Sequence, residues 1–237
     1  MAVWVGTSGW AYTAWKPGFY PADVSSKNFL RYYSTQLNAV EVNYSFRRLL
    51  SEKIIAAWLE QTPREFRFAL KAHQAITHFR RLRNTEEPMA RFVEAIQPLI
   101  QTKRLAPVLF QLPPNLKADA GLLREFAESM PRGFRAAMEF RHESWFTDST
   151  YDILRRNKIA LCVAESDELE TPEVFTAMFA YFRLRRSSYS AAARKKIAVR
   201  MRLLAAEGKE VYAFFKHEER PESPLWAREL YRRMQRP

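Results

Sequence analysis

The stretch RAAMEFRH, residues 135–142, is a short apolar run that ends in charged and titratable side chains. Seven other short apolar runs occur along the chain, most of them with similar polar endings: VWVGTSG (3–9), AVEVNYSF (39–46), FRFALKA (66–72), PVLFQLP (107–113), IALCVAES (159–166), AYFRLRR (180–186) and EVYAFFKH (210–217). The stretches between the runs read as helices. Eight strand–helix alternations in 237 residues predict an α/β protein, a (β/α)8 TIM barrel forming a single domain over residues 1–237.

Helix signals between the runs support this fold. Ser51 is placed to cap a helix over 51–60, and Gly208 is placed to end the long helix that begins near residue 188. Pro98 is expected to end or kink a helix that starts at the acidic residues 86 and 87. A short sixth helix is expected over 172–179, part of which could belong to the following strand.

Residue alternation assigns a direction to each polar side chain, because the helix-facing positions of a buried barrel strand are apolar. This rule predicts that the following residues point into the barrel: Glu41, Asn43, Lys71, Gln111, Glu139, Arg141, Glu165, Arg183, Arg185 and Lys216. Burying a charge without a partner costs about 3–5 kcal/mol of folding free energy. Their convergence indicates a functional site at the C-terminal mouth of the barrel. The alternative is a salt-bridge network that only fills the interior.

All four histidines follow strand ends, and they are His73, His78, His142 and His217. Histidine titrates near neutral pH and transfers protons, although a histidine in a loop often serves only as a cap. The spacing forms no HExxH or cysteine-based zinc motif. We predict no resident cofactor. A divalent metal held by Glu41, Glu139, Glu165 and a histidine is geometrically allowed and stays open.

Charge and aromatic residues point to the kind of ligand. The net charge of +12 favours anionic partners, although a basic surface can also lack a specific partner. Arginines follow several strand ends and would ring the mouth: residues 47, 48, 80, 81, 83, 185 and 186. Trp10, Tyr12 and Trp145 are expected to stack on a planar ligand. Trp15, Phe19 and Tyr20 are expected to form a lid packed on the barrel.

Other features of the sequence indicate the cellular compartment of the protein and exclude some kinds of site. A single cysteine, Cys162, cannot form an internal disulfide, which favours a reducing compartment. No apolar stretch is long enough for a membrane span, and strand pattern begins at once, so we expect a cytoplasmic protein without membrane attachment. The sequence contains neither a GxGxxG nor a Walker A motif, which argues against a dinucleotide or ATP site. The oligomeric state stays open.

The sequence resembles the YecE-like proteins, the domain-of-unknown-function family 72. The resemblance rests on the stretches GTSGWAYTAWKPGFYP (6–21), VEVNYSFRRL (40–49), FRFALKAHQAITH (66–78), PVLFQLPP (107–114), EFRHESW (139–145) and ALCVAES (160–166). It implies a TIM barrel and no particular activity. Many members end strand seven with an Arg-Leu-His-Gly-like sequence and strand eight with an asparagine pair. This chain has RLRR and FKHEE at these places, and the added positive charge implies a more anionic ligand.

Together these observations favour an acid–base enzyme acting on a phosphorylated or other anionic substrate. Hydrolysis, lyase and isomerase chemistry all fit, and hydrolysis is favoured. Glu139 or Glu41 is expected to be the general base, with Lys71 as acid or charge stabiliser. The remaining catalytic candidates are His78, His142 and Asn43. The expected substrate-binding residues are Arg141, Arg183, Arg185 and Lys216, together with Gln111, Glu165 and the aromatic residues Trp10, Tyr12 and Trp145. The alternative is a non-catalytic protein that binds single-stranded nucleic acid or another polyanion. A scaffold whose partner binds the helical rim is a third possibility.

Overall fold

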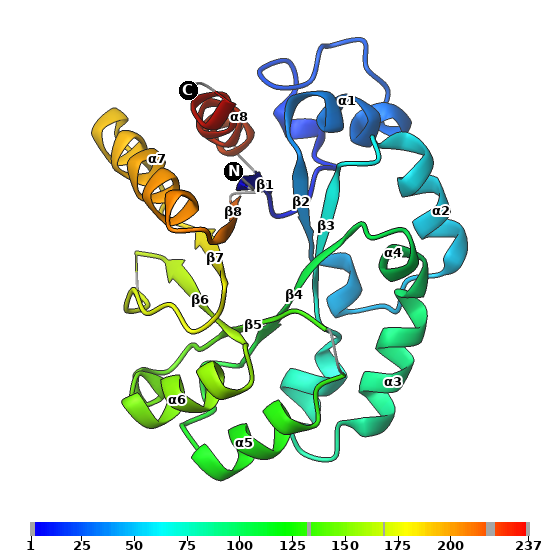
Figure 1. The fold of residues 1–237 in the computed structure, drawn as a ribbon. Coiled ribbons are helices and arrows are strands. Elements are labelled where there is room, and N and C mark those ends of the chain that lie inside the picture. Colours follow the sequence, from blue (N-terminus) through cyan, green and yellow to red (C-terminus); the bar gives the residue numbers. More distant parts are fainter. Residues whose placement is uncertain (1–2, 132–133, 168, 217–220, 236–237) are drawn as a thin grey trace.

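The computed structural model describes residues 3–131, 134–167, 169–216 and 221–235. Eight strands form one parallel sheet in which each strand lies beside its neighbour in sequence and β1 pairs with β8 (Figure 1). The strands are β1 (Val3–Thr7), β2 (Ala39–Val42), β3 (Arg67–Lys71), β4 (Leu105–Gln111), β5 (Ala136–Glu139), β6 (Ala160–Glu165), β7 (Phe179–Leu184) and β8 (Glu210–Phe215). The helices are arranged around the strands. The predicted (β/α)8 TIM barrel is therefore confirmed.

The barrel closes between β1 and β2 mainly through side chains. The Asn38 amide accepts from the backbone N–H of Val5 (2.8 Å) and donates to the carbonyl of Val3 (2.9 Å). The Tyr33 hydroxyl accepts from the N–H of Thr7 (2.8 Å) and donates to the carbonyl of Ala39 (3.0 Å). Gly6 lies so close to β2 that an added methyl group would overlap the carbonyl oxygen of Ala39. These contacts satisfy backbone groups that a continuous ladder would otherwise pair.

The α-helices cover the outside of the sheet. They are α1 (Phe29–Gln36), α2 (Glu52–Gln61), α3 (Glu86–Ala95), α4 (Gln97–Gln101), α5 (Ala120–Glu128), α6 (Asp148–Arg156), α7 (Ala191–Ala206) and α8 (Glu222–Gln235). The Ser51 side chain caps α2 by accepting from the N–H of Ile54, and α3 ends just before Pro98, as predicted. Gly208 follows α7 with φ +83°, which is the expected helix stop. None of the helices in the described ranges is both long and apolar enough to cross a lipid bilayer.

The short sixth helix predicted over 172–179 is wrong. These residues form a segment without a helix between β6 and β7, and Phe179 begins β7. The Thr176 hydroxyl accepts from the N–H of Leu161 (2.8 Å) and donates to the carbonyl of Ile159 (2.6 Å). The segment is therefore tied to the backbone at the start of β6, where a helix would not offer these bonds.

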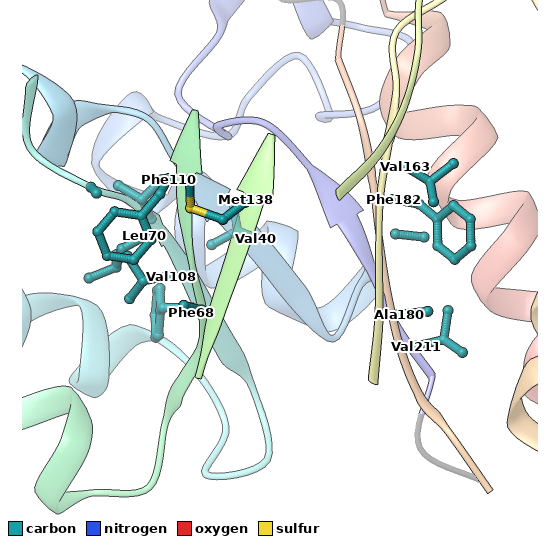
Figure 2. Packing of buried hydrophobic residues seen from close by; sticks show 14 of the residues in the cluster. Val40, Phe68, Leu70, Val108, Phe110, Met138, Val163, Ala180, Phe182 and Val211 are labelled. Atoms are coloured by element: carbon teal, nitrogen blue, oxygen red, sulfur yellow. The ribbon is translucent and has the colours of Figure 1, made fainter. Parts of the chain in front are cut away.

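Two apolar layers follow from residue alternation along the strands. Figure 2 shows Val40, Phe68, Leu70, Val108, Phe110 and Met138 on one side of the barrel and Val163, Ala180, Phe182 and Val211 on the other. These side chains belong to the large cluster that packs against the helices. A second cluster fills the barrel and contains mostly small residues beside a few large rings, among them Ala69, Ala137, Cys162, Tyr181 and Phe214. The polar residues described next lie above this inner layer.

Candidate active site

Arg183 on β7 forms the centre of a buried ion-pair network. Its Nη2 lies 2.7 Å from Oε1 of Glu41, and its Nη1 lies 2.6 Å from Oε2 of Glu139. The arginine side chain is 2% exposed and both carboxylates are 0% exposed. The three strands β2, β5 and β7 are thus joined across the barrel. The network satisfies charges that would otherwise be costly to bury.

Glu41 is held by further hydrogen bonds. The Ser8 hydroxyl donates to Oε1 (2.6 Å), and the Tyr181 hydroxyl donates to Oε2 (2.7 Å). Burial, followed by the charge of Glu41, raises the pKa of Tyr181, so this hydroxyl remains a proton donor. Both oxygens of Glu41 therefore accept hydrogen bonds inside the protein.

Glu139 is engaged at both oxygens as well. Arg141 contacts its Oε1 through Nε, and Arg185 Nη1 lies 3.4 Å from the same atom. Gln111 joins the network by accepting from Arg183 (3.2 Å) and Arg141 (3.5 Å). Burial alone raises the pKa of Glu139, but the guanidinium groups of Arg183 and Arg141 outweigh it and hold the pKa below its ordinary value. A carboxylate with a lowered pKa is a weak base, which argues against Glu139 as the general base. The general-base role of Glu41 stays a prediction.

Lys71, at the end of β3, has an amine that is suited to proton transfer. Burial, and next the charge of Arg183, lower the pKa of Lys71 to about 8, although Glu139 and Glu41 act in the opposite direction. Lys216 also lowers this pKa, which places its charge near the amine. The ammonium nitrogen lies 3.9 Å from the ring centroid of Phe46. Such a contact keeps the amine in place without neutralising it.

His78 lies close to this lysine. It belongs to a π-helical turn, Ala75–Phe79, that follows β3, and π-helical turns are frequent at functional sites. Burial, then the charges of Lys71 and Arg81, lower the pKa of His78 below its ordinary value. Its ring meets the Phe46 ring at right angles, with centroids 4.8 Å apart. Phe46 therefore contacts both Lys71 and His78.

The other histidines have different surroundings. Nδ1 of His142 lies 2.9 Å from the Ser144 hydroxyl and accepts from the Ser144 N–H (3.2 Å), which makes it the cap of a short 3-10 turn. Nδ1 of His73 accepts from the N–H of Ala75 (3.3 Å). Nδ1 of His78 likewise lies 2.9 Å from the Thr77 hydroxyl, so the proton-relay role of His78 or His142 stays a prediction. His217 lies outside the described residues.

Two of the predicted site residues do not reach the site. Glu165 points toward α7, where Arg200 binds it at 2.6 Å and Tyr189 donates to it at 3.5 Å. The prediction that Glu165 points inward was wrong, because Ala164 and Cys162 occupy the inner positions of β6. Trp145 is completely buried. Its indole N–H donates to the carbonyl of Leu116 (2.8 Å), so the expected stacking on a ligand is wrong too.

The structure places the remaining candidates at the mouth. Arg141, Arg185, Lys216, Gln111 and Asn43 are half-buried around the network. Trp10 and Tyr12 lie in a neighbouring pocket of about 300 Å³. Trp15, Phe19 and Tyr20, which were expected to form a lid on the barrel, belong to the loop between β1 and α1. Each is no more than 2% exposed, and their rings pack on one another and on Phe29 and Tyr33 of α1.

The ligand set considered for a divalent metal is not assembled. Glu165 faces α7, and both oxygens of Glu41 and Glu139 are engaged by other side chains. Within the described ranges no group of three histidine, cysteine or acidic side chains is arranged to hold a metal ion. The expectation that the protein has no resident cofactor stays a prediction.

Known proteins share this architecture. The family described as "Protein of unknown function DUF72" matches residues 4–237 of the chain. The chain belongs to the DUF72 family. UPF0759 protein YunF of Bacillus subtilis is 28% identical over 156 residues, which are 63% of this chain and 54% of YunF. UPF0759 protein YecE of Escherichia coli K12 is 27% identical over 145 residues, 61% of this chain and 50% of YecE.

The chain thus spans about half the length of these curated relatives in the matched regions. A crystal structure of a DUF72 family protein from Thermotoga maritima is similar along its whole length, with 28% identity, full coverage of both chains and a TM-score of 0.88. These similarities confirm the resemblance to the YecE-like family and the barrel fold. They name no reaction.

Sequence reasoning missed three residues of the site. Ser8 and Tyr181 bind Glu41, and Phe46 contacts Lys71. Tyr181 could have been found, because it lies two residues before Arg183 and therefore on the same face of β7. Ser8 and Phe46 lie beyond the ends of their strands, where alternation gives no direction.

Proposed function

We propose that the protein is an acid–base enzyme that hydrolyses a small phosphorylated substrate at the C-terminal mouth of the barrel. The observation that carries this proposal is the position of the half-buried Lys71 within a group of cations, where burial and the neighbouring charges lower the pKa of its amine to about 8. At pH 7 about nine in ten of such amines are protonated and can still release the proton readily. Lys71 is therefore suited to donate a proton to a leaving-group oxygen.

The charge of the mouth suits an anion. Five cationic side chains, Lys71, Arg141, Arg183, Arg185 and Lys216, are grouped with two carboxylates, Glu41 and Glu139. The excess of positive charge is therefore three while Lys71 is protonated. A phosphate dianion would offset most of it. Arg141, Arg185 and Lys216 are the half-buried cations that could contact such a ligand, whereas Arg183 is too deeply buried.

His78 supplies the complementary base. Its lowered pKa keeps the imidazole neutral at pH 7, where it can accept a proton from water. In the proposed reaction, the water oxygen attacks phosphorus, its proton passes to His78, and Lys71 donates its proton to the departing oxygen. Glu41 and Glu139 act as positioning residues, because their oxygens hold Arg183, Arg141 and Arg185.

The first test is the binding of inorganic phosphate, measured by isothermal titration calorimetry at low ionic strength. We expect binding to wild type and a loss of at least about tenfold in affinity in Arg185→Ala. Arg155→Ala, which removes an exposed arginine paired with Asp152 on α6, is the matched control and should bind normally. Absence of phosphate binding to wild type would contradict the proposal.

The second test is turnover of phenyl phosphate, whose leaving group needs a proton. Lys71→Met should lower kcat by about 10²-fold or more with little change in KM, and the fall in rate above pH 8 should disappear. Unchanged kcat in Lys71→Met would show that Lys71 is not the acid.

Exposed arginines at the rim favour the second candidate, a polyanion-binding protein. Arg47, Arg48, Arg80, Arg81 and Arg83 are all exposed near the strand ends. Such a protein would bind single-stranded nucleic acid with an affinity that falls steeply with salt. Its binding would not depend on Lys71, and a Lys71→Met variant therefore separates the two functions.

A further inference from the structure

We infer that the substrate carries, beside its anionic group, a planar ring with an N–H donor, and that this ring binds in the pocket between the ends of β1 and β2 and helix α2. The inference rests on the proposed function, because it concerns the other end of the same substrate. The pocket has a volume of about 300 Å³. A dry cavity of about half that volume can hold benzene, so one or two fused rings fit.

Rigid aromatic side chains form the walls. Trp10 and Trp58 meet edge to face with ring centroids 5.3 Å apart, and Trp58 in turn stacks on Phe68 of β3. Tyr12 contacts the buried Trp15 at 4.9 Å. Ile54 of α2 and the exposed Tyr44 also line the pocket. Ring faces and edges fixed in this way suit a planar ligand, because little side-chain freedom is lost on binding.

The pocket borders the C-terminal end of β2, the strand that carries Glu41. Gly9 lines it, and its N–H donates to the backbone carbonyl of Glu41 (2.8 Å). Ser8, the residue before Gly9, donates its hydroxyl proton to the Glu41 carboxylate. Asn43 also lines the pocket and lies two residues after Glu41, so their Cα atoms are within about 7 Å of each other. The pocket and the network are therefore separated by about two residues of β2, a span that one small molecule can cover.

Asn43 provides the polar contact. Its Oδ1 is buried, and among the residues that the structure describes it accepts no hydrogen bond. An unsatisfied buried acceptor is costly, and a ligand N–H would remove that cost. The remaining lining is mostly apolar, so a hydrogen bond to Asn43 would orient the ring.

The test uses phosphonates, which cannot be hydrolysed at the phosphorus–carbon bond under these conditions. Ethylphosphonate, phenylphosphonate and 2-phenylethylphosphonate are titrated by calorimetry, together with the 4-amino derivative of the tighter aryl compound. We expect the ring to increase affinity about tenfold over ethylphosphonate and the amino group to add about threefold. Asn43→Ala should remove the effect of the amino group and leave most of the effect of the ring.

Ile54→Trp fills the pocket from α2 and is expected to remove the gain from the ring without changing the affinity for ethylphosphonate. Ile54→Leu, which conserves volume, is the matched control and should keep the gain. Equal affinities for the aryl and ethyl compounds, or a gain that survives Ile54→Trp, would overturn the inference. In that case ethylphosphonate binding that is lost in Arg185→Ala would leave the proposed function standing. Failure of every phosphonate to bind wild type would overturn both.

Discussion

The Nη1 atom of Arg183 lies 2.6 Å from Oε2 of Glu139, at a depth where neither side chain is more than 2% exposed. The same guanidinium binds Glu41 through Nε and Nη2. One buried cation thus bridges two carboxylates, one on β2 and one on β5. The other cations of the mouth remain in excess, and this excess is the basis for the proposed anion site.

Removing the shared cation should destabilise the protein. In Arg183→Met both carboxylates lose their central partner, and we expect the free energy of unfolding to fall by about 3 kcal/mol at pH 7. Urea unfolding monitored by circular dichroism measures this change. The triple variant Glu41→Gln/Glu139→Gln/Arg183→Met should regain much of the loss. An Arg183→Met protein as stable as wild type would mean that the network contributes nothing to folding.

The stability contributed by Glu139 should increase with pH. Its pKa is lower in the folded protein than its ordinary value of 4.5. The ionised group therefore stabilises the fold above pH 4.5, and this stabilisation is lost as the pH falls through the lower, folded-state pKa. We expect Glu139→Gln to be less stable than wild type at pH 6, with a difference that shrinks toward pH 2. A difference that is constant across this range would contradict the lowered pKa.

The ionised form of Lys71 should destabilise the fold, whereas the ionised form of Glu139 stabilises it. Its folded pKa of about 8 lies below the ordinary 10.5, so the protonated amine costs folding free energy below pH 8. This cost disappears as the pH rises from 8 to 10.5. Lys71→Met should therefore be more stable than wild type at pH 7, by up to about 3 kcal/mol, and the advantage should vanish near pH 10.5. Thermal unfolding at both pH values measures this difference in stability. A Lys71→Met variant less stable than wild type at pH 7 would contradict the prediction.

The closure of the barrel predicts a contrast between two glycines. In Gly6→Ala the new methyl group meets the backbone of Ala39, which cannot move without separating β1 from β2. We expect a loss of about 3 kcal/mol or more. In Gly121→Ala, within α5, the nearest atom is a side-chain oxygen at 3.4 Å. Because alanine favours helix, this control should be neutral or gain up to about 1 kcal/mol. Equal melting temperatures for the two variants would contradict this description of the closure.

Much of the barrel could be predicted from sequence, because parallel strands buried on both faces leave a clear trace. The apolar runs gave the eight strands, and alternation within them correctly placed Glu41, Lys71, Glu139 and Arg183 inside. For Glu165 the wrong face was assigned. The inner positions of β6 are Cys162 and Ala164, which lie opposite Tyr181 and Arg183 of β7 and are small because those two side chains fill the interior.

Contacts made beyond the strand ends could not be predicted in the same way. Loop residues such as Trp145 follow no sequence period. The buried Trp145 donates a hydrogen bond to the carbonyl of Leu116, which belongs to a different loop. The role of Phe46 likewise requires the fold, since it brings together Lys71 and His78 from another strand–loop unit. The protonation states of the site residues depend on their burial and on neighbouring charges, and no local sequence pattern shows either.

The most direct test of the central claim is a titration of the Lys71 amine. The lysines are dimethylated with ¹³C-formaldehyde and followed by NMR from pH 6 to 11, with Lys71→Arg used to assign the signal. We predict a midpoint near pH 8 for Lys71, as against about 10.5 for an exposed lysine, and a higher midpoint when inorganic phosphate is bound. A midpoint near 10.5 without phosphate would show that Lys71 is an ordinary surface amine and would contradict the proposed acid–base site.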